Sequence, residues 1–385
     1  METKVKSSSE IQTKLKLEKS LFDTLLKQYE KLSVDELLEQ YKKLLNDFEE
    51  NILDNNNFLI HVNVLKYVKD LKTNNLSFDN NRYPSLKDKN FNEKIFLKKE
   101  FYINKIKDPF SNYDTTKSFE EQLNEKSNDY CKSWNVNQNQ NFLKNFLSPD
   151  TPYNGILLFH GTGVGKTCSS ITIVEQYKNE LEILNKKIFI ISNPGVKSNF
   201  IKTLFDINKL DNIENQCLED TYLKPFLKFK NNKPLLKQNI LKKISNHYDF
   251  QGYVSLANMI DNIIKRSKNV SLENQEKYIK NEINKQFSNS VIIIDEAHNI
   301  KQSDGLKKVP PMLELLLKHS VNVKLILLTA TPMFDNAKEI VFLLDLLLIN
   351  DKRPKINMKK LFNSQGKLID EEYLINKSRG YISYM

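Results

Sequence analysis

The stretch ILLFHGTGVGKT, from Ile156 to Thr167, decides the fold of this 385-residue chain. An apolar run leads directly into a glycine-rich turn that ends in Lys-Thr. This order predicts a strand, a loop whose backbone N–H groups converge on a phosphate, and the start of a helix. The residues that we expect to hold the phosphates are Gly161, Thr162, Gly163, Val164, Gly165, Lys166 and Thr167.

Two side chains of this loop have separate expected roles. Lys166 can reach the outer phosphates of a nucleotide, and the hydroxyl of Thr167 can bind Mg²⁺. The usual pattern has glycine where this chain has His160, which we regard as a mild departure. The alternative is a glycine turn beside a lone lysine, but the strand expected before the loop argues against it.

A second apolar run, SVIIIDEAH from Ser290 to His298, ends in two adjacent carboxylates. Parallel strands deliver functional side chains at their carboxyl ends, so this pair should face the phosphate loop. We expect Asp295 to bind Mg²⁺, through water, and Glu296 to orient and deprotonate the attacking water. Lys166 and His298 complete the candidate catalytic set. The alternative is an ordinary transition from strand to loop.

A third apolar run, VKLILLT from Val323 to Thr329, continues into Ala330 and Thr331. Two hydroxyls at a strand end can link the carboxylates to a bound nucleic-acid strand through hydrogen bonds. Thr329, Ala330 and Thr331 are therefore the candidate coupling residues. An ordinary turn rich in serine and threonine is the competing interpretation.

An amide side chain just before the first strand is a candidate for adenine recognition. Gln140, two residues before Phe142, is the better candidate, and Gln138 is the second. An amide offers both a donor and an acceptor to the edge of a base. A solvated glutamine explains the same residue equally well.

Composition limits the class of protein. Hydrophobic residues make up 39% of the chain, enough for a folded core. Lys and Arg outnumber Asp and Glu by 58 to 48, which suits a polyanionic partner. Cys131, Cys168 and Cys217 form no CxxC pair, so we expect neither a zinc site nor a disulfide framework. Without a secretory signal or an apolar run that could span a bilayer, we expect an intracellular protein without membrane contact.

The remaining chain divides into predicted helices and strands. Residues 1–130 should be mostly helical, with Ser33 to Glu36 as a capping box before Leu37, Leu38, Tyr41, Leu44, Leu45 and Phe48. One helix should follow the phosphate loop to Leu184, and residues 187–192 should be a strand. After it, Lys197, Ser198 and Asn199 open a helix whose N-terminus could hold a nucleic-acid phosphate. Residues 206–245 should be a peripheral connection or insertion in which Pro225 and Pro234 break any long helix.

The three stretches together resemble the first motor domain of superfamily 2 helicases. GTGVGKT, DEAH and LTATP match motifs I, II and III in order and approximate spacing, over roughly residues 130–385. The helix after TATP resembles the Snf2-type branch. The sequence before the phosphate loop and the terminal SRGYISYM resemble helicase-like ATPases of nucleocytoplasmic large DNA viruses, of the poxvirus early transcription factor and nucleoside triphosphate phosphohydrolase types.

The resemblance implies an α/β fold with a RecA-like P-loop NTPase parallel sheet and helices on both faces. We therefore predict a helical region over residues 1–130 and the ATP-binding motor domain over residues 131–385. The family pairs two such domains, with ATP, Mg²⁺ and nucleic acid between them, and the second domain supplies an arginine finger. We expect no second domain within this chain and do not assign the finger to Arg379.

The expected function is Mg²⁺- and ATP-dependent action on DNA or RNA, as a helicase or translocase in viral transcription or genome handling. Contacts to nucleic acid should be made through the phosphate backbone, and the location would be a virion or the host cytoplasm. One alternative is an ATP-binding module that docks onto a second motor domain or a transcription complex and has little activity of its own. The other is a P-loop ATPase unrelated to nucleic acid.

Overall fold

The computed structural model describes residues 83–105, 116–132, 138–302, 306–333 and 338–385, together with scattered positions between 24 and 65. The chain divides into two compact units, Met1–Arg82 and Tyr83–Met385.

The described positions of the first unit confirm one predicted helix start. The N–H of Ser33 donates to the Glu36 carboxylate at 2.6 Å, and the N–H of Glu36 donates to the Ser33 hydroxyl at 3.3 Å. This reciprocal pair is a capping box. Leu37 and Leu44 are buried, as the helical spacing predicted. The other predicted core positions of this helix, Leu38, Tyr41, Leu45 and Phe48, lie outside the described residues.

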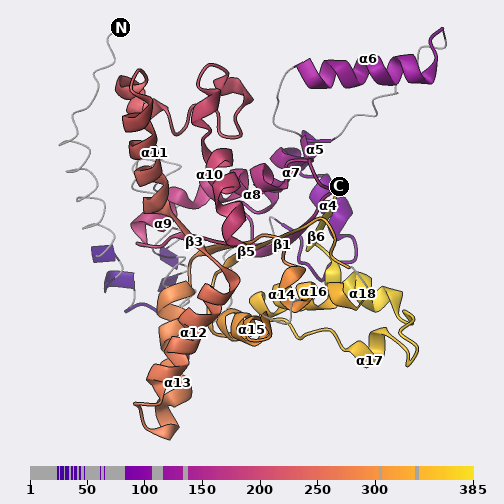
Figure 1. Ribbon diagram of the computed structural model, residues 1–385. Helices are drawn as coiled ribbons and strands as arrows, with labels where there is room; N and C mark the ends of the chain where they lie inside the picture. Colours follow the sequence, from indigo (N-terminus) through magenta and orange to yellow (C-terminus); the bar gives the residue numbers. More distant parts are fainter. Residues whose placement is uncertain are drawn as a thin grey trace. The chain divides into compact units, whose positions relative to one another are not determined.

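The second unit is built on a six-stranded sheet in which every strand pair is parallel (Figure 1). The strands are β1 Gly155–Phe159, β2 Ile188–Ile191, β3 Tyr248–Gln251, β4 Val291–Ile294, β5 Lys324–Thr329 and β6 Ile382–Tyr384. Their order across the sheet is β3-β2-β4-β5-β1-β6. This is a RecA-like α/β fold, so the predicted fold class is confirmed.

Helices cover both faces of the sheet (Figure 1). One face packs against α12 Tyr253–Ser267, α13 Leu272–Phe287, α15 Val309–His319, α16 Glu339–Asn350 and α18 Glu371–Ser378. The other packs against α4 Phe91–Phe96, α5 Lys99–Tyr102, α7 Gln138–Phe146, α8 Lys166–Val174, α9 Lys178–Ile183, α10 Lys197–Leu204 and α11 Lys233–His247. Along β1, Leu157 belongs to the first core, and Ile156 and Leu158 belong to the second. Burial on both faces explains why the inner strands are continuously apolar.

The second unit contains further helices and 3₁₀ turns. They are the helices α6 Phe119–Lys132, α14 Asn299–Gln302 and α17 Met358–Leu361, and the 3₁₀ turns η1 Glu175–Tyr177, η2 Pro194–Val196, η3 Ile207–Lys209, η4 Ile213–Asn215 and η5 Lys224–Phe229. None of the described helices is both long and apolar enough to cross a bilayer.

Two helix predictions were wrong in detail. The single helix expected after the phosphate loop is interrupted by η1, directly after a run of β-branched residues from Ile171 to Val174 that disfavours helix. Pro234 does not break a helix but lies in the first turn of α11, a helix of 15 residues. Its missing N–H costs nothing there, because N–H groups in a first turn have no acceptor within the helix.

The sixth strand is a feature that the sequence analysis did not predict. β6 pairs with β1, with Leu157 opposite Ile382 and Phe159 opposite Tyr384. Beyond it, the N–H of Gly161 donates to the carbonyl of Met385 at 3.0 Å. The last residues of the chain therefore lie beside the first glycine of the phosphate loop.

Residues 83–105 pack with the sheet unit through aromatic side chains. Phe91 and Tyr83 both contact the ring of Tyr153, with centroids 5.5 and 6.2 Å apart, and Phe101 contacts Phe146 at 6.3 Å. All five rings are buried. The boundary predicted between residues 130 and 131 stays a prediction.

Candidate nucleotide-binding site

The phosphate loop connects the end of β1 to the start of α8, as predicted. Gly163 and Gly165 have φ values of +82° and +86°, in the left-handed region that glycine adopts most readily. A Cβ atom on Gly165 would also lie 2.9 Å from the side-chain nitrogen of Gln140. Gly165 is therefore required by its backbone conformation, whereas the flexible Gln140 side chain could move away from an added Cβ atom.

The Lys166 side chain turns back into the loop that precedes it. Its ammonium group donates to the carbonyls of His160 and Gly161, each at 2.9 Å. These two bonds hold the charge at the mouth of the loop, where α8 directs its N-terminal N–H groups. A bound phosphate would be an additional, charged acceptor for the same ammonium group.

His160 is buried between the loop and the sixth strand. It is 1% exposed, and its Nε2 lies 2.9 Å from the hydroxyl of Ser383, whereas its Nδ1 has no partner among the residues that the structure describes. Burial, with a smaller contribution from the charge of Lys166, lowers the pKa of His160 to about 4. The imidazole is therefore neutral at pH 7, and its position beside β6 gives the departure from glycine a structural reason.

Gln140 lies on α7 and is buried against the phosphate loop, next to Gly165. Gln138, the second candidate, is exposed at the first position of the same helix. This difference favours Gln140 as the amide closest to a nucleotide. Recognition of adenine by either residue stays a prediction.

Asp295 and Glu296 follow β4 at the carboxyl edge of the sheet, as predicted. Asp295 is 7% exposed. Burial and, secondly, the charge of Glu296 raise its pKa to about 6, while the Glu296 N–H and the charge of Lys166 lower it. The influence of Lys166 indicates that the sheet brings the phosphate loop and the carboxylates together. Glu296 keeps 37% of its side chain exposed, so it can reach a water molecule.

The backbone of Glu296 is unusual, with φ at +43°. Non-glycine residues adopt this region rarely and at an energetic cost, so surrounding contacts must hold it. Tyr253, at the start of α12, supplies one such contact, since its hydroxyl donates to the carbonyl of Asp295 at 2.5 Å. Sequence analysis missed Tyr253, because nothing in its local sequence connects it to residues some forty positions away.

His298 connects the carboxylates to the predicted coupling residues. Its Nδ1 lies 3.4 Å from the Glu296 carboxylate and 2.8 Å from the Thr329 hydroxyl. The Thr329 hydroxyl, fully buried, also accepts the N–H of Thr331 at 3.1 Å. Ala330 is half-buried and Thr331 is exposed. A continuous set of polar contacts thus joins β4 to the end of β5.

The site offers the donors that Mg²⁺ prefers. The Thr167 hydroxyl and the Asp295 carboxylate are hard oxygen ligands, and Mg²⁺ is usually held by one or two such groups together with substrate phosphates and water. The described residues contain no cluster of three or more acidic, histidine or cysteine side chains that could hold a metal alone. The donor set therefore fits a metal that arrives with a nucleotide.

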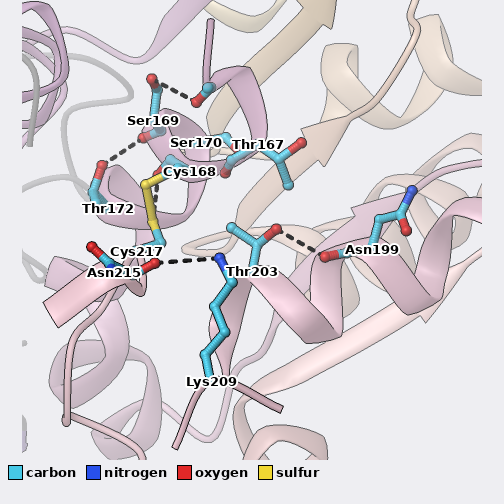
Figure 2. Close-up of a disulfide and its surroundings, with 11 residues drawn as sticks. Thr167, Cys168, Ser169, Ser170, Thr172, Asn199, Thr203, Lys209, Asn215 and Cys217 are labelled. Atoms are coloured by element: carbon cyan, nitrogen blue, oxygen red, sulfur yellow. Dashed lines mark hydrogen bonds between the residues drawn. A yellow bond between two sulfur atoms is a disulfide. The ribbon is translucent and has the colours of Figure 1, made fainter. Parts of the chain in front are cut away.

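A disulfide lies directly behind the phosphate loop (Figure 2). The sequence analysis expected no disulfide, so that prediction was wrong. Cys168 follows Thr167 on α8, and its sulfur bonds to that of Cys217, 49 positions later, with Cα atoms 5.7 Å apart. The pairing depends on the segment after α10 folding back over α8, where Leu210, Tyr222 and Leu223 are buried. No local spacing of cysteines could have indicated it.

The helix start proposed for nucleic-acid contact is accessible. Lys197, Ser198 and Asn199 begin α10 and are all exposed. The ammonium group of Lys197 lies 5.3 Å from the ring centre of Phe250, at the end of β3. The contact of these residues with nucleic acid stays a prediction.

Comparison with known proteins agrees with this geometry. Residues 63–367 match the model of the SNF2-related domain. Two proteins of Acanthamoeba polyphaga mimivirus, each named "Putative ATP-dependent RNA helicase", are 30% and 29% identical to 80% and 64% of this chain. A "Putative helicase" of Invertebrate iridescent virus 3 is 27% identical over 64% of the chain. The matches span 27%, 40% and 22% of those relatives. With most of its length matched by the family model, the chain belongs to the SNF2-related domain family.

Proposed function

We propose that the chain binds Mg-ATP at residues 161–167, hydrolyses it with Asp295 and Glu296, and couples hydrolysis to contact with DNA or RNA as a helicase or translocase. The polar connection from Glu296 through His298 to Thr329 is the observation that carries the proposal. A simple nucleotide-binding site has no need of a path from its carboxylates to a neighbouring strand end.

The chemistry divides among the residues of the site. Lys166 and the loop N–H groups bind the outer phosphates, and Thr167 and Asp295 orient the metal that comes with them. Bound Mg²⁺ would neutralise charge that develops on the phosphates. Glu296 accepts a proton from the attacking water, and His298 holds Glu296 and Thr329 in register.

The test is a steady-state ATPase assay with single- and double-stranded DNA and RNA at several salt concentrations, with the second motor domain of a longer relative supplied in trans. We expect turnover to rise with nucleic acid and the effect to weaken with salt, because phosphate contacts release counterions. Thr329→Val, which removes the hydroxyl, should keep ATP binding and lose the stimulation, whereas Thr329→Ser should keep both. Rapid turnover without a response to any nucleic acid would overturn the coupling and favour an unrelated ATPase.

The similarity to mimivirus and iridovirus proteins supports a viral setting for this activity. Transcription and genome handling are the processes in which an ATP-driven motor on nucleic acid would act. Slow turnover with normal ATP affinity, unchanged by nucleic acid, would instead favour a module that docks onto a larger assembly.

A further inference from the structure

A basic cavity lies away from the nucleotide site. It has a volume of about 270 Å³ and is lined by Lys87, Arg353, Tyr373, Asn376, Lys377 and Arg379. Four of the six lining side chains are cations, and the other two are neutral. Cations in one cavity repel each other, so such a wall is most stable when an anion is bound.

Both arginines are held by neutral oxygens. Arg353 donates to the Tyr381 hydroxyl at 3.2 Å and to the Asn376 carbonyl at 3.4 Å. Arg379 donates to the Asn376 side-chain oxygen at 2.8 Å and to the Lys87 carbonyl at 3.5 Å. Asn376 thus connects the two guanidinium groups. These bonds fix their orientation without neutralising their charge.

Carboxylates are near the cavity but do not line it. Asp351 accepts the Tyr381 hydroxyl at 2.5 Å, and burial raises its pKa. Asp88 pairs with Lys94 at 2.6 Å. Among the described residues, none of the four lining cations forms an ion pair with an acidic side chain. Weaker electrostatic contacts do exist, since Arg353 acts on Asp351, Arg379 on Asp88 and Lys377 on Asp345. Because none of these carboxylates lines the cavity, the wall itself remains positive.

The use of arginine sets this cavity apart from the rest of the surface. Almost all basic residues of the chain are lysines, and the only arginines are Arg82, Arg266, Arg353 and Arg379. Two of these line one cavity. A guanidinium group binds phosphate oxygens in a planar, two-pronged geometry that an ammonium group cannot reproduce. The two arginines thus give this cavity a phosphate-binding geometry that lysines could not supply.

The cavity lies at the amino ends of β1 and β6, whereas the phosphate loop lies at the carboxyl end of β1. Arg379 and Lys377 precede β6, which runs parallel to β1, and Arg353 follows α16 near Asn154, just before β1 begins. The phosphate loop follows the other end of β1. The five residues of β1 place the cavity and the phosphate loop about 16 Å apart along the strand. A ligand at Lys166 therefore does not occupy this cavity.

We propose that this cavity binds a phosphate group, either of a free oligophosphate or of a nucleic-acid backbone. At about 30 Å³ per water-sized group, its volume holds roughly nine such groups. That matches one or two phosphates, and the rest of a longer ligand would extend from the open side of the cavity. The guanidinium groups of Arg353 and Arg379 bind the phosphate oxygens, and Lys87 and Lys377 add charge at the rim.

The first test measures tripolyphosphate binding by calorimetry at low salt, in a Lys166→Ala background that disables the phosphate loop. The cavity variant Lys87→Gln/Lys377→Gln is compared with the control Lys359→Gln/Lys367→Gln, which removes the same charge from exposed lysines outside the cavity. We expect the control to bind and the cavity variant to lose about tenfold or more in affinity. Equal affinity of the two variants would overturn the proposal.

A single substitution shows whether weaker binding by the double variant could be due to misfolding. Lys87 is exposed, and only its backbone carbonyl is bonded within the cavity wall. Lys87→Glu should therefore leave the thermal unfolding midpoint unchanged and still weaken tripolyphosphate binding. Unweakened binding by a folded Lys87→Glu protein would count against the site as firmly as the double variant.

The second test identifies the source of the phosphate. In the same background, fluorescence anisotropy follows single-stranded DNA and RNA oligonucleotides over a range of salt. If the backbone is the ligand, the cavity variant binds more weakly than the control and its salt slope is shallower by about one. If the ligand is a free oligophosphate, oligonucleotide affinities are equal and only tripolyphosphate binding differs. The proposal does not rest on ATP hydrolysis, since the phosphate loop is disabled throughout.

Discussion

Asp295 and Glu296 are neighbours in the chain, but their surroundings separate their roles. Asp295 is buried at the end of β4, under the influence of Lys166. Glu296 is more exposed and contacts His298. A buried carboxylate facing a lysine suits a metal and its phosphates, and an accessible one suits a water molecule. The backbone turn at Glu296 directs the two side chains to these different places.

Lys166→Ala should lower the affinity for Mg-ATP by about tenfold or more, because it removes a charged donor to the phosphates. Circular dichroism should be unchanged, since the lysine bonds only to loop carbonyls. Fluorescence titration with a labelled ATP analogue measures the loss, with Lys359→Ala as an exposed control. Equal affinity for Lys166→Ala and the parent would show that the phosphate-loop assignment is wrong.

Glu296→Gln should keep ATP binding and lose turnover by roughly 10²–10⁴-fold, because the amide keeps the shape of the side chain but cannot accept a proton. A steady-state phosphate-release assay against a blank without protein measures the loss. A matched control is Glu314→Gln on α15, whose carboxylate pairs with Lys355 outside the site. Turnover equal to the parent would remove Glu296 from the role of general base.

In the metal-free protein, Asp295 should lower the free energy of unfolding by an amount that depends on pH. Its pKa is raised from 3.8 to about 6, so the folded state holds a proton that the unfolded state releases between these values. The free energy of unfolding therefore falls as pH rises from about 4 to 6. Above pH 6 the destabilisation caused by Asp295 stays constant. Asp295→Asn, which is always neutral, should relieve on the order of 3 kcal/mol at pH 7 and nothing near pH 3.

Urea unfolding in EDTA at pH 3, 5 and 7 measures this difference. Asp211→Asn, at an exposed position, changes the charge equally and serves as the control. If the gain from Asp295→Asn were the same at all three pH values, packing rather than ionisation would be its cause.

At the scale of elements, the strands buried on both faces were predictable, because β1, β2, β4 and β5 are continuous apolar runs. β6 was not, since it has three residues, none of them buried, and exists through its pairing with β1. The loop and carboxylates follow β1 and β4 directly, so their placement at the carboxyl edge was predictable, while their roles stay predictions. Tyr253 and the Cys168–Cys217 bond were missed because both depend on contacts between distant segments.

The disulfide should stabilise the segment behind the phosphate loop. Closing a loop of this length restricts the unfolded chain by about 4 kcal/mol in the chain-entropy model, with measured values typically about 2–4. Reductant should therefore lower the thermal unfolding midpoint of the parent. The Cys168→Ser/Cys217→Ser protein should start lower and not respond. A parent midpoint that is unaffected by reductant, with both thiols then found free, would contradict the prediction.

At the scale of the molecule, the described residues contain one sheet and, at its carboxyl edge, one phosphate loop. Of the described arginines, Arg353 and Arg379 lie at the opposite edge of the sheet from the phosphate loop. Charge that develops on the outer phosphate is therefore stabilised by Lys166 but not by either of these guanidinium groups. Family members that pair two motor domains bring an arginine from the second domain to this position, a contribution on the order of 10³–10⁵ in rate.

The 385-residue polypeptide should accordingly bind ATP, hydrolyse it slowly and separate strands poorly. A single sheet unit also offers few contacts to the phosphates of a nucleic acid, so its nucleic-acid binding should be weak and strongly salt-dependent. Adding the second motor domain of a longer relative in trans should raise turnover and make it depend on nucleic acid. ATPase and strand-separation assays with and without that domain test this, and a domain whose arginine finger is replaced by alanine is the control. Robust strand separation by the polypeptide alone would show that one motor domain is sufficient and that the arginine contribution comes from within it.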